Sequence, residues 1–361
     1  YPTVPTIDLK IHPKEHDLII GTFGRAAYVL DDIRPLRKIA QQNAVLQKDL
    51  AAFESPEAYI VNFASPQGVL FAGKDMFQGD NRPEGAMLTY YAKVGKDKNK
   101  PANEGDKEKD KEKGGKDDLV KVEILNTEGK VIRTLYHEPD SGMNRLQWDL
   151  REKATRFPNS PKPKPNTSDR GGFLAAPATY KVRFSYKGAK DSTMVTLKPE
   201  PRLTPNPAVI QQNIANYTRW TKSVESTTAA VDRLKEMKET IELVSKQLGE
   251  DTAEKKKVAE KAKALKDNIQ TLLEKITGKE KVQGLVRNAN LLSSRLGQIQ
   301  SYFDYYEKPT AMVETLLPSV EKEVQDFVNQ VNTLTTTQFT EFRKEVEALK
   351  FSVFKDYETL K

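Results

Sequence analysis

Two histidines near the start of the chain have the spacing of two metal ligands on one helical face. His12 and His16 are four residues apart, and Asp17 follows directly. Pro13 and the strand-like residues around the pair oppose a helix, and no glutamate occupies the position that a metalloprotease motif requires. The sequence therefore predicts a turn between two strands here, and no metal site.

A pair of adjacent carboxylates, Asp31 and Asp32, has the residue type needed for acid–base catalysis. The pair follows a strand-like run and precedes two arginines, Arg34 and Arg37. We therefore expect these carboxylates to cap the end of the strand or to form a salt bridge with one of the arginines.

The remaining motifs also predict no catalytic arrangement. Gly21 and Gly24 do not form a phosphate loop, because no helix and no Lys-Ser/Thr pair follows them. No serine lies in a G-x-S-x-G motif, and Trp148 lies in a strand-like run that predicts a core residue. We expect no nucleophile, base and oxyanion-stabilising group to meet in these residues. The sequence leans against an enzyme and predicts no cofactor.

The composition excludes further classes of protein. The chain has 361 residues, three histidines and no cysteine, which excludes disulfides, thiol catalysis and cysteine-based metal sites. Its 58 basic and 51 acidic side chains give a net charge of +7, but the run 96–118 holds eight lysines and eight acids. Nucleic-acid binding needs an excess of basic residues on one face. We therefore expect a disordered, solvated loop at 96–118, no nucleic-acid partner, and no transmembrane segment, since no apolar run is long enough.

Four consecutive segments of the chain must position these residues. Residues 1–38 contain three short strand-like runs, and residues 39–84 form a connecting segment with a short helix at 41–52. Residues 85–200 contain about seven short runs with alternating apolar side chains, which is typical of a β-sandwich. After a proline-rich linker, the period changes to that of helices over residues 204–361.

Residue types locate several turns within the β-rich segment. The run Asn126-Thr127-Glu128-Gly129 predicts a turn with the glycine at positive φ. Lys187 and Gly188 predict the turn of a hairpin between the last two strands. Residues 156–172 are rich in Pro, Ser, Lys and Gly, which predicts a long loop.

The helical segment predicts an antiparallel bundle of five helices. Apolar side chains recur every seven residues in two rows from Ile210 to Leu248, which indicates one long helix with a buried seam. Lys238 and Ser245 interrupt one of these rows. We therefore expect the end of the helix at Leu248 to be more solvated than its middle.

Two features divide the later helices of the bundle. Pro309 can occupy the first turn of the fourth helix, and Pro318 should kink this helix or mark its true start. A turn of the chain near residues 335–337 would separate the fourth helix from the fifth.

Two stretches of the chain resemble known families. Residues 7–37 (IDLKIHPKEHDLIIGTFGRAAYVLDDIRPLR) resemble the closing blade of bacterial sortilin-like, BNR-repeat β-propeller proteins. Residues 120–186 are similar to the immunoglobulin-like domain of the flagellar hook-capping type, through VKVEILNTEGKVIRTLY, SGMNRLQWDLR and APATYKVRFSY. Such proteins commonly carry a helical tail, and EKPTAMV at 307–313 resembles a join within it.

The resemblance implies a multidomain chain, first β and then α. It would hold terminal β-propeller blade strands, an immunoglobulin-like β-sandwich and an antiparallel helical bundle. The blade strands would pair with an upstream propeller segment of the same protein or with a separate fragment, and another cell-envelope protein is a further expected partner. Such proteins are exported to the periplasm, the outer-membrane surface or the medium. Because the chain begins at Tyr1, we expect a processed piece whose signal peptide could have been lost.

The implied function is non-catalytic binding, scaffolding or assembly through contacts with protein or glycan. The alternative is a set of accessory domains of a sialidase- or glycoside-hydrolase-like propeller enzyme, a label that such proteins often carry. Phe23 stands where relatives have His, Ala26 and Ala178 stand where they have Gly, and no Asp-box occurs, so these residues do not support the hydrolase label. Arg25 matches the motif and is the expected binding residue, unless it only bonds carbonyls of neighbouring strands.

Overall fold

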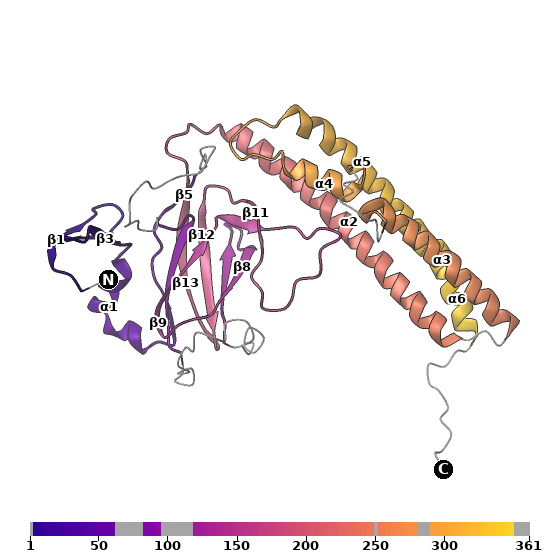
Figure 1. Cartoon of the computed structure of the whole chain (residues 1–361), viewed down its shortest axis with the longest axis horizontal. Coiled ribbons are helices and arrows are strands. Elements are labelled where there is room, and N and C mark those ends of the chain that lie inside the picture. Colours follow the sequence, from indigo (N-terminus) through magenta and orange to yellow (C-terminus); the bar gives the residue numbers. More distant parts are fainter. Residues whose placement is uncertain (1–2, 62–81, 95–117, 249–251, 280–288, 350–361) are drawn as a thin grey trace, which may run out of the picture. The chain divides into compact units, whose positions relative to one another are not determined.

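The structure is a computed structural model that describes residues 3–61, 82–94, 118–248, 252–279 and 289–349. The chain forms two compact units. The first comprises Tyr1–Ala154 and Pro163–Pro205, and the second comprises Thr155–Lys162 and Asn206–Lys361. Strands dominate the first unit and helices the second (Figure 1). This confirms the coarse prediction of β-structure followed by a helical region.

The first unit opens with a separate antiparallel sheet of three strands. Its strands lie in the order of the sequence: β1 (Thr6–Ile11), β2 (Leu18–Thr22) and β3 (Ala27–Leu30). Helix α1 (Arg34–Gln41) and a 3-10 turn (Asn43–Gln47) follow this sheet.

The remaining strands of this unit form three further sheets. The five-stranded sheet has the order β5 (Ala58–Ile60), β13 (Ala189–Pro199), β12 (Thr179–Tyr186), β7 (Val120–Leu125) and β8 (Val131–His137). The three-stranded sheet has the order β4 (Leu50–Ala52), β6 (Ala86–Ala92) and β9 (Gly142–Trp148). The two-stranded sheet pairs β10 (Arg151–Lys153) with β11 (Gly171–Leu174).

Aromatic side chains join the five-stranded and three-stranded sheets in a common core. The ring of Tyr90 lies 5.3 Å from that of Phe184, and Trp148 lies 5.3 Å from Tyr180. Trp148 is fully buried, and its indole N–H donates to the carbonyl of Arg151 at 2.9 Å. The expectation that Trp148 is a core residue is confirmed.

The segment expected to be a connection contributes to both of these sheets. β4 pairs antiparallel with β6, and β5 pairs parallel with β13. The helix expected at 41–52 is absent: this range holds the 3-10 turn Asn43–Gln47 and β4, and α1 ends where the expected helix would begin. The expected loop at 96–118, apart from residue 118, lies outside the described residues.

Both turns predicted from residue types are present. Gly129 has a φ of 79° between β7 and β8, and the amide of Gly129 donates to the carbonyl of Asn126 at 3.0 Å. Lys187 and Gly188 have φ values of 46° and 88° between β12 and β13. Two consecutive positive φ values are the signature of the tight hairpin turn that matches strand twist.

The helical unit contains one long helix at its start and a second long helical segment at its end. Its elements are α2 (Pro207–Leu248), α3 (Ala253–Thr277), α4 (Leu292–Gln300), α5 (Ala311–Leu334), a π-helical turn (Thr335–Phe339) and α6 (Thr340–Ala348). Residues 280–288, between α3 and α4, lie outside the described part.

Helices α2 and α5 run in the same direction, as the first and third segments of an antiparallel bundle do. Arg219 pairs with Glu321, and further along both helices the Thr335 hydroxyl donates to the sulfur of Met237 at 3.7 Å. Contacts that advance together in sequence mean that the two helices run in the same direction. The helical segments that lie between α2 and α5 in the sequence run in the opposite direction, so the chain comes back to the start of α2 before α5 begins.

The turn expected near residues 335–337 is absent. The chain continues from α5 through the π-helical turn into α6, as Figure 1 shows. The side-chain hydroxyls of Thr335, Thr336 and Thr337 each donate to the backbone carbonyl four residues earlier. These bonds satisfy the hydroxyls within a continuous helix. Likewise, α5 begins at Ala311 with Thr310 as its N-cap, so neither Pro309 nor Pro318 marks its start.

The apolar seam of α2 is buried in the middle of the helix and at its C-terminal end. Leu248 is 2% exposed, and Leu234 in the middle is 0% exposed. Val258 at the start of α3 and Phe342 of α6 belong to the same apolar cluster. The expectation that the Leu248 end is more solvated is therefore wrong, because α3 and α6 extend along this end of α2.

A short piece of the expected loop 156–172 belongs to the helical unit. Arg156 forms an ion pair with Asp232 of α2, and the hydroxyl of Thr228 donates to the carbonyl of Arg156 at 2.8 Å. The ring of Phe157 lies 5.8 Å from that of Trp220. These contacts hold residues 155–162 against α2.

One partly buried pair in the first unit makes the stability of this unit depend on pH. The hydroxyl of Tyr90 lies 2.6 Å from Nδ1 of His137, and burial lowers the pKa of His137, against the opposing charges of Asp140 and Glu138. The folded state therefore disfavours the charged ring. The neutral His137 ring makes its full contribution to the free energy of unfolding above the pKa of the unfolded chain, about 6.5. The contribution is lost as the pH falls below that value, because the unfolded chain then binds a proton at His137 more readily than the folded chain does.

We expect the variant His137→Gln to show a smaller loss of unfolding free energy between pH 7.5 and pH 5.5 than the wild type. Denaturant unfolding at the two pH values measures this difference. Lys190→Gln is the matched control, since Lys190 is an exposed strand residue of the same unit, and it should keep the wild-type dependence. An unchanged pH dependence in His137→Gln would contradict the assignment.

Candidate functional site

The two histidines with ligand-like spacing lie in the turn between β1 and β2. The amide of His12 donates to the carbonyl of Asp17 at 2.8 Å, and the amide of His16 donates to the carbonyl of His12 at 3.0 Å. The Nδ1 atom of His12 accepts from the amide of Glu15 at 3.0 Å. The expected turn is therefore present, and one histidine ring stabilises it.

The adjacent carboxylates do not act as a pair. Asp32 is fully buried, and its two oxygens accept from Nε and Nη2 of Arg34 at 2.7 and 3.2 Å. The carbonyl of Asp32 accepts from Arg145 at 2.6 Å, and its amide donates to Asp17 at 2.8 Å. The predicted salt bridge with Arg34 is confirmed, and Asp32 fixes the chain between β3 and α1.

Arg25, the expected binding residue, lies at the tip of the turn between β2 and β3. Arg25 is exposed, and so is Phe23. Gly24 and Ala26 have φ values of 78° and 57°, so Ala26 occupies a backbone conformation that favours glycine. Among the described residues, no ion pair or hydrogen bond holds the guanidinium of Arg25, and its binding role stays a prediction.

The sheet β1–β3 leaves apolar side chains exposed on both of its faces. The register places Leu9, Ile20 and Tyr28 side by side on one face, and Ile19 and Val29 on the other. Leu9 is 56% exposed and Val29 is 58% exposed. Isolated exposed apolar residues are ordinary, but several of them on one small sheet make this sheet a candidate contact surface.

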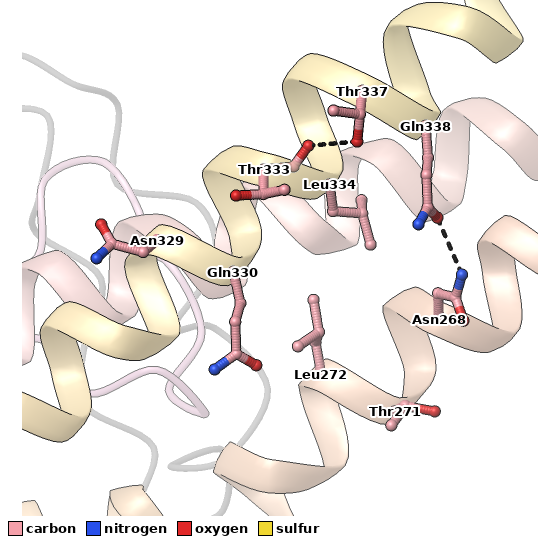
Figure 2. Close-up of a pocket in the computed structure, with 9 residues that line it drawn as sticks. All are labelled: Asn268, Thr271, Leu272, Asn329, Gln330, Thr333, Leu334, Thr337 and Gln338. Atoms are coloured by element: carbon pink, nitrogen blue, oxygen red, sulfur yellow. Dashed lines mark hydrogen bonds between the residues drawn. The ribbon is translucent and has the colours of Figure 1, made fainter.

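The second candidate is a groove in the helical unit, between α3 and the junction of α5 with the π-helical turn. Its volume is about 470 Å³. Figure 2 shows the buried Leu272 and Leu334 extending toward each other from the two helices, while neutral polar side chains surround them. The lining residues are Asn268, Thr271, Leu272, Asn329, Gln330, Thr333, Leu334, Thr337 and Gln338.

Hydrogen bonds fix several of the polar groups that line this groove. The amide of Asn268 donates to Oε1 of Gln338 at 2.9 Å across the groove (Figure 2). Lys275 donates to Oε1 of Gln330 at 2.9 Å, and Thr337 donates to the carbonyl of Thr333 at 2.7 Å. Amides and hydroxyls donate and accept hydrogen bonds without carrying charge. The groove can therefore bind a neutral polar surface, but its lining residues supply no general base.

The sequence analysis did not identify this groove, although the sequence contains a signal for it. The fourteen residues from 327 to 340 carry no charge, in a chain in which 30% of residues are charged. An uncharged polar stretch on a surface helix is unusual in such a composition. The π-helical turn lies in the same stretch, and such turns occur frequently at functional sites.

The chain was compared with family models, with curated proteins and with solved structures. No family model, no curated protein and no solved structure matches it. Within the described ranges, no cluster of three or more His, Asp or Glu side chains is placed to hold a metal ion. In the same ranges, no helix combines the length and the apolar character needed to cross a bilayer. The resemblance to propeller and hook-capping families therefore stays a prediction.

Proposed function

We propose that this chain is a non-catalytic binding and scaffolding region of an exported bacterial β-propeller protein. The observation that carries the proposal is the sheet β1–β3 with apolar side chains exposed on both faces. A propeller blade has four strands, and this sheet has three. One further strand at an edge of the sheet would complete a blade, and neighbouring blades would cover its faces.

Assembly also explains why such a sheet can persist in a folded protein. An open edge and an apolar face expose the chain to aggregation unless another element covers them. An upstream propeller segment of the same protein, or a separate fragment, is the partner with the matching structure. Export and the immunoglobulin-like character of the β-sheets are parts of this proposal that rest on the sequence resemblance.

The groove in the helical unit supplies a second binding surface in this proposal. Its amide and hydroxyl groups suit contacts with the polar groups of a protein or a glycan. Since the lining carries no charge, recognition there would depend on hydrogen-bond geometry and on the two leucines at its base.

Site-specific photo-crosslinking in cells tests the proposal. A photoreactive phenylalanine analogue in place of Val29 should form cross-links to a strand-like segment outside the printed sequence, because Val29 faces the neighbouring blade. The matched control is the same analogue at Met194, an exposed apolar strand residue in the same unit, which should remain uncross-linked. Cross-links from Val29 only to residues 82–205 of this chain, or none above the control, would contradict the proposal.

A further inference from the structure

Helix α1 presents several basic side chains to a small hollow. Arg34, Arg37, Lys38 and Gln41 are spaced so that they share one face of the helix. Phe53 and Glu54, which follow β4, also line the hollow together with Pro35, and its volume is about 200 Å³.

Arg34 enters the hollow in a fixed orientation. Its Nε and Nη2 atoms are held by the buried carboxylate of Asp32 at 2.7 and 3.2 Å, which leaves Nη1 free to contact a second acceptor. That atom lies 3.4 Å from Oε1 of Glu54, whose side chain is 76% exposed. Strong charge-assisted hydrogen bonds are shorter, at about 2.7–2.9 Å. Glu54 is therefore a weak partner that another anion can replace.

The other two cations of the hollow are Arg37 and Lys38. The ammonium of Lys38 lies 5.7 Å from the centre of the Phe53 ring, and this contact positions a cation without neutralising it. Within the described residues, no carboxylate forms an ion pair with Arg37 or Lys38. The three cations and the two carboxylates of Asp32 and Glu54 give a local net charge of 3 − 2 = +1. If Glu54 moves away, this local net charge becomes +2.

We propose that this hollow binds a tetrahedral oxyanion, phosphate or sulfate, either free or as the end group of a larger molecule. The anion would replace Glu54 at Nη1 of Arg34 and contact the side chains of Arg37 and Lys38. Guanidinium groups match the geometry of such oxyanions, because their N–H groups form a rigid fork. This inference is independent of the proposed propeller function.

Calorimetric titration of the full chain tests the inference. Inorganic phosphate, inorganic sulfate and glycerol 3-phosphate are compared with chloride at constant ionic strength. We expect a Kd on the order of 1 mM for phosphate and sulfate and no saturable binding of chloride. Equal binding of glycerol 3-phosphate would assign the hollow to the end group of a larger molecule, whereas its exclusion would assign it to the free ion.

Variants then connect the binding to the hollow. The double variant Arg37→Gln, Lys38→Gln should weaken phosphate binding at least about tenfold, since two of the three direct charges are lost. Glu54→Gln should strengthen it, because the competing carboxylate is gone. Lys190→Gln, in an exposed strand residue of the same unit, is the matched control and should bind as the wild type does. Saturable binding that the double variant retains, or no binding by the wild-type chain, would overturn the inference.

Discussion

Replacing Trp220 with alanine is expected to destabilise the helical unit by about 3–5 kcal/mol. Trp220 is fully buried in α2, and its indole N–H donates to the carbonyl of Leu296 in α4 at 2.9 Å. The rings of Tyr217, Phe157 and Phe303 lie 5.1, 5.8 and 5.9 Å from its ring. The substitution leaves a cavity among these rings and a buried carbonyl without its donor, and both effects lower the free energy of unfolding.

The two tryptophans of the chain allow this loss to be assigned to one unit. Denaturant unfolding of the full chain, followed by circular dichroism of the helices, should shift to lower denaturant in Trp220→Ala. The fluorescence of Trp148 reports the β-rich unit separately, and its transition should stay in place. The free energy of unfolding should fall less in Trp220→Phe. It should hardly change in Leu243→Ala, because Leu243 is exposed. A Trp220→Ala variant as stable as Leu243→Ala would contradict this account of the core.

Local sequence patterns predicted most of the individual strands and helices. The seven-residue rows predicted α2 because side chains at this spacing share one face of a helix, and Val224, Val231 and Ile241 are indeed buried. The glycine turns were predictable because a positive φ has a steric cause that depends on one residue. The salt bridge of Asp32 was predictable because its partner, Arg34, is only two residues away.

The features that the sequence did not predict depend on residues that are distant in the chain. The three-residue strand β4 has no clear alternation of its own, and it becomes a strand because β6 supplies its hydrogen-bond partners. The threonine-rich stretch near residue 335 has a low intrinsic helix propensity, yet packing against α2 and α3 keeps it helical. The groove forms only where the uncharged stretch 327–340 meets Asn268, Thr271 and Leu272 of α3. The stretch alone therefore indicated one wall of the groove, but neither the opposite wall nor the shape.

A second large loss of stability is expected from alanine at Gly85, just before β6. The φ of Gly85 is +104°, and a Cβ atom there would lie 2.2 Å from the carbonyl oxygen of Trp148. That oxygen belongs to the backbone of β9, which pairs with β6 through Ala86 and Trp148, so it cannot move away without disturbing the ladder. Backbone strain of about 1–3 kcal/mol and overpacking of about 1–3 kcal/mol add to about 2–6 kcal/mol.

Gly129→Ala separates these two effects, because its φ of +79° is also positive but no atom lies within 4 Å of the added Cβ. This control should therefore lose only the strain, about 1–3 kcal/mol. Both variants are best measured in a Trp220→Phe background, in which fluorescence reports Trp148 alone. If Gly85→Ala loses no more than Gly129→Ala, the close approach of β9 to Gly85 is wrong. A larger loss at Gly85 means that the glycine is needed there for space as well as for its backbone conformation.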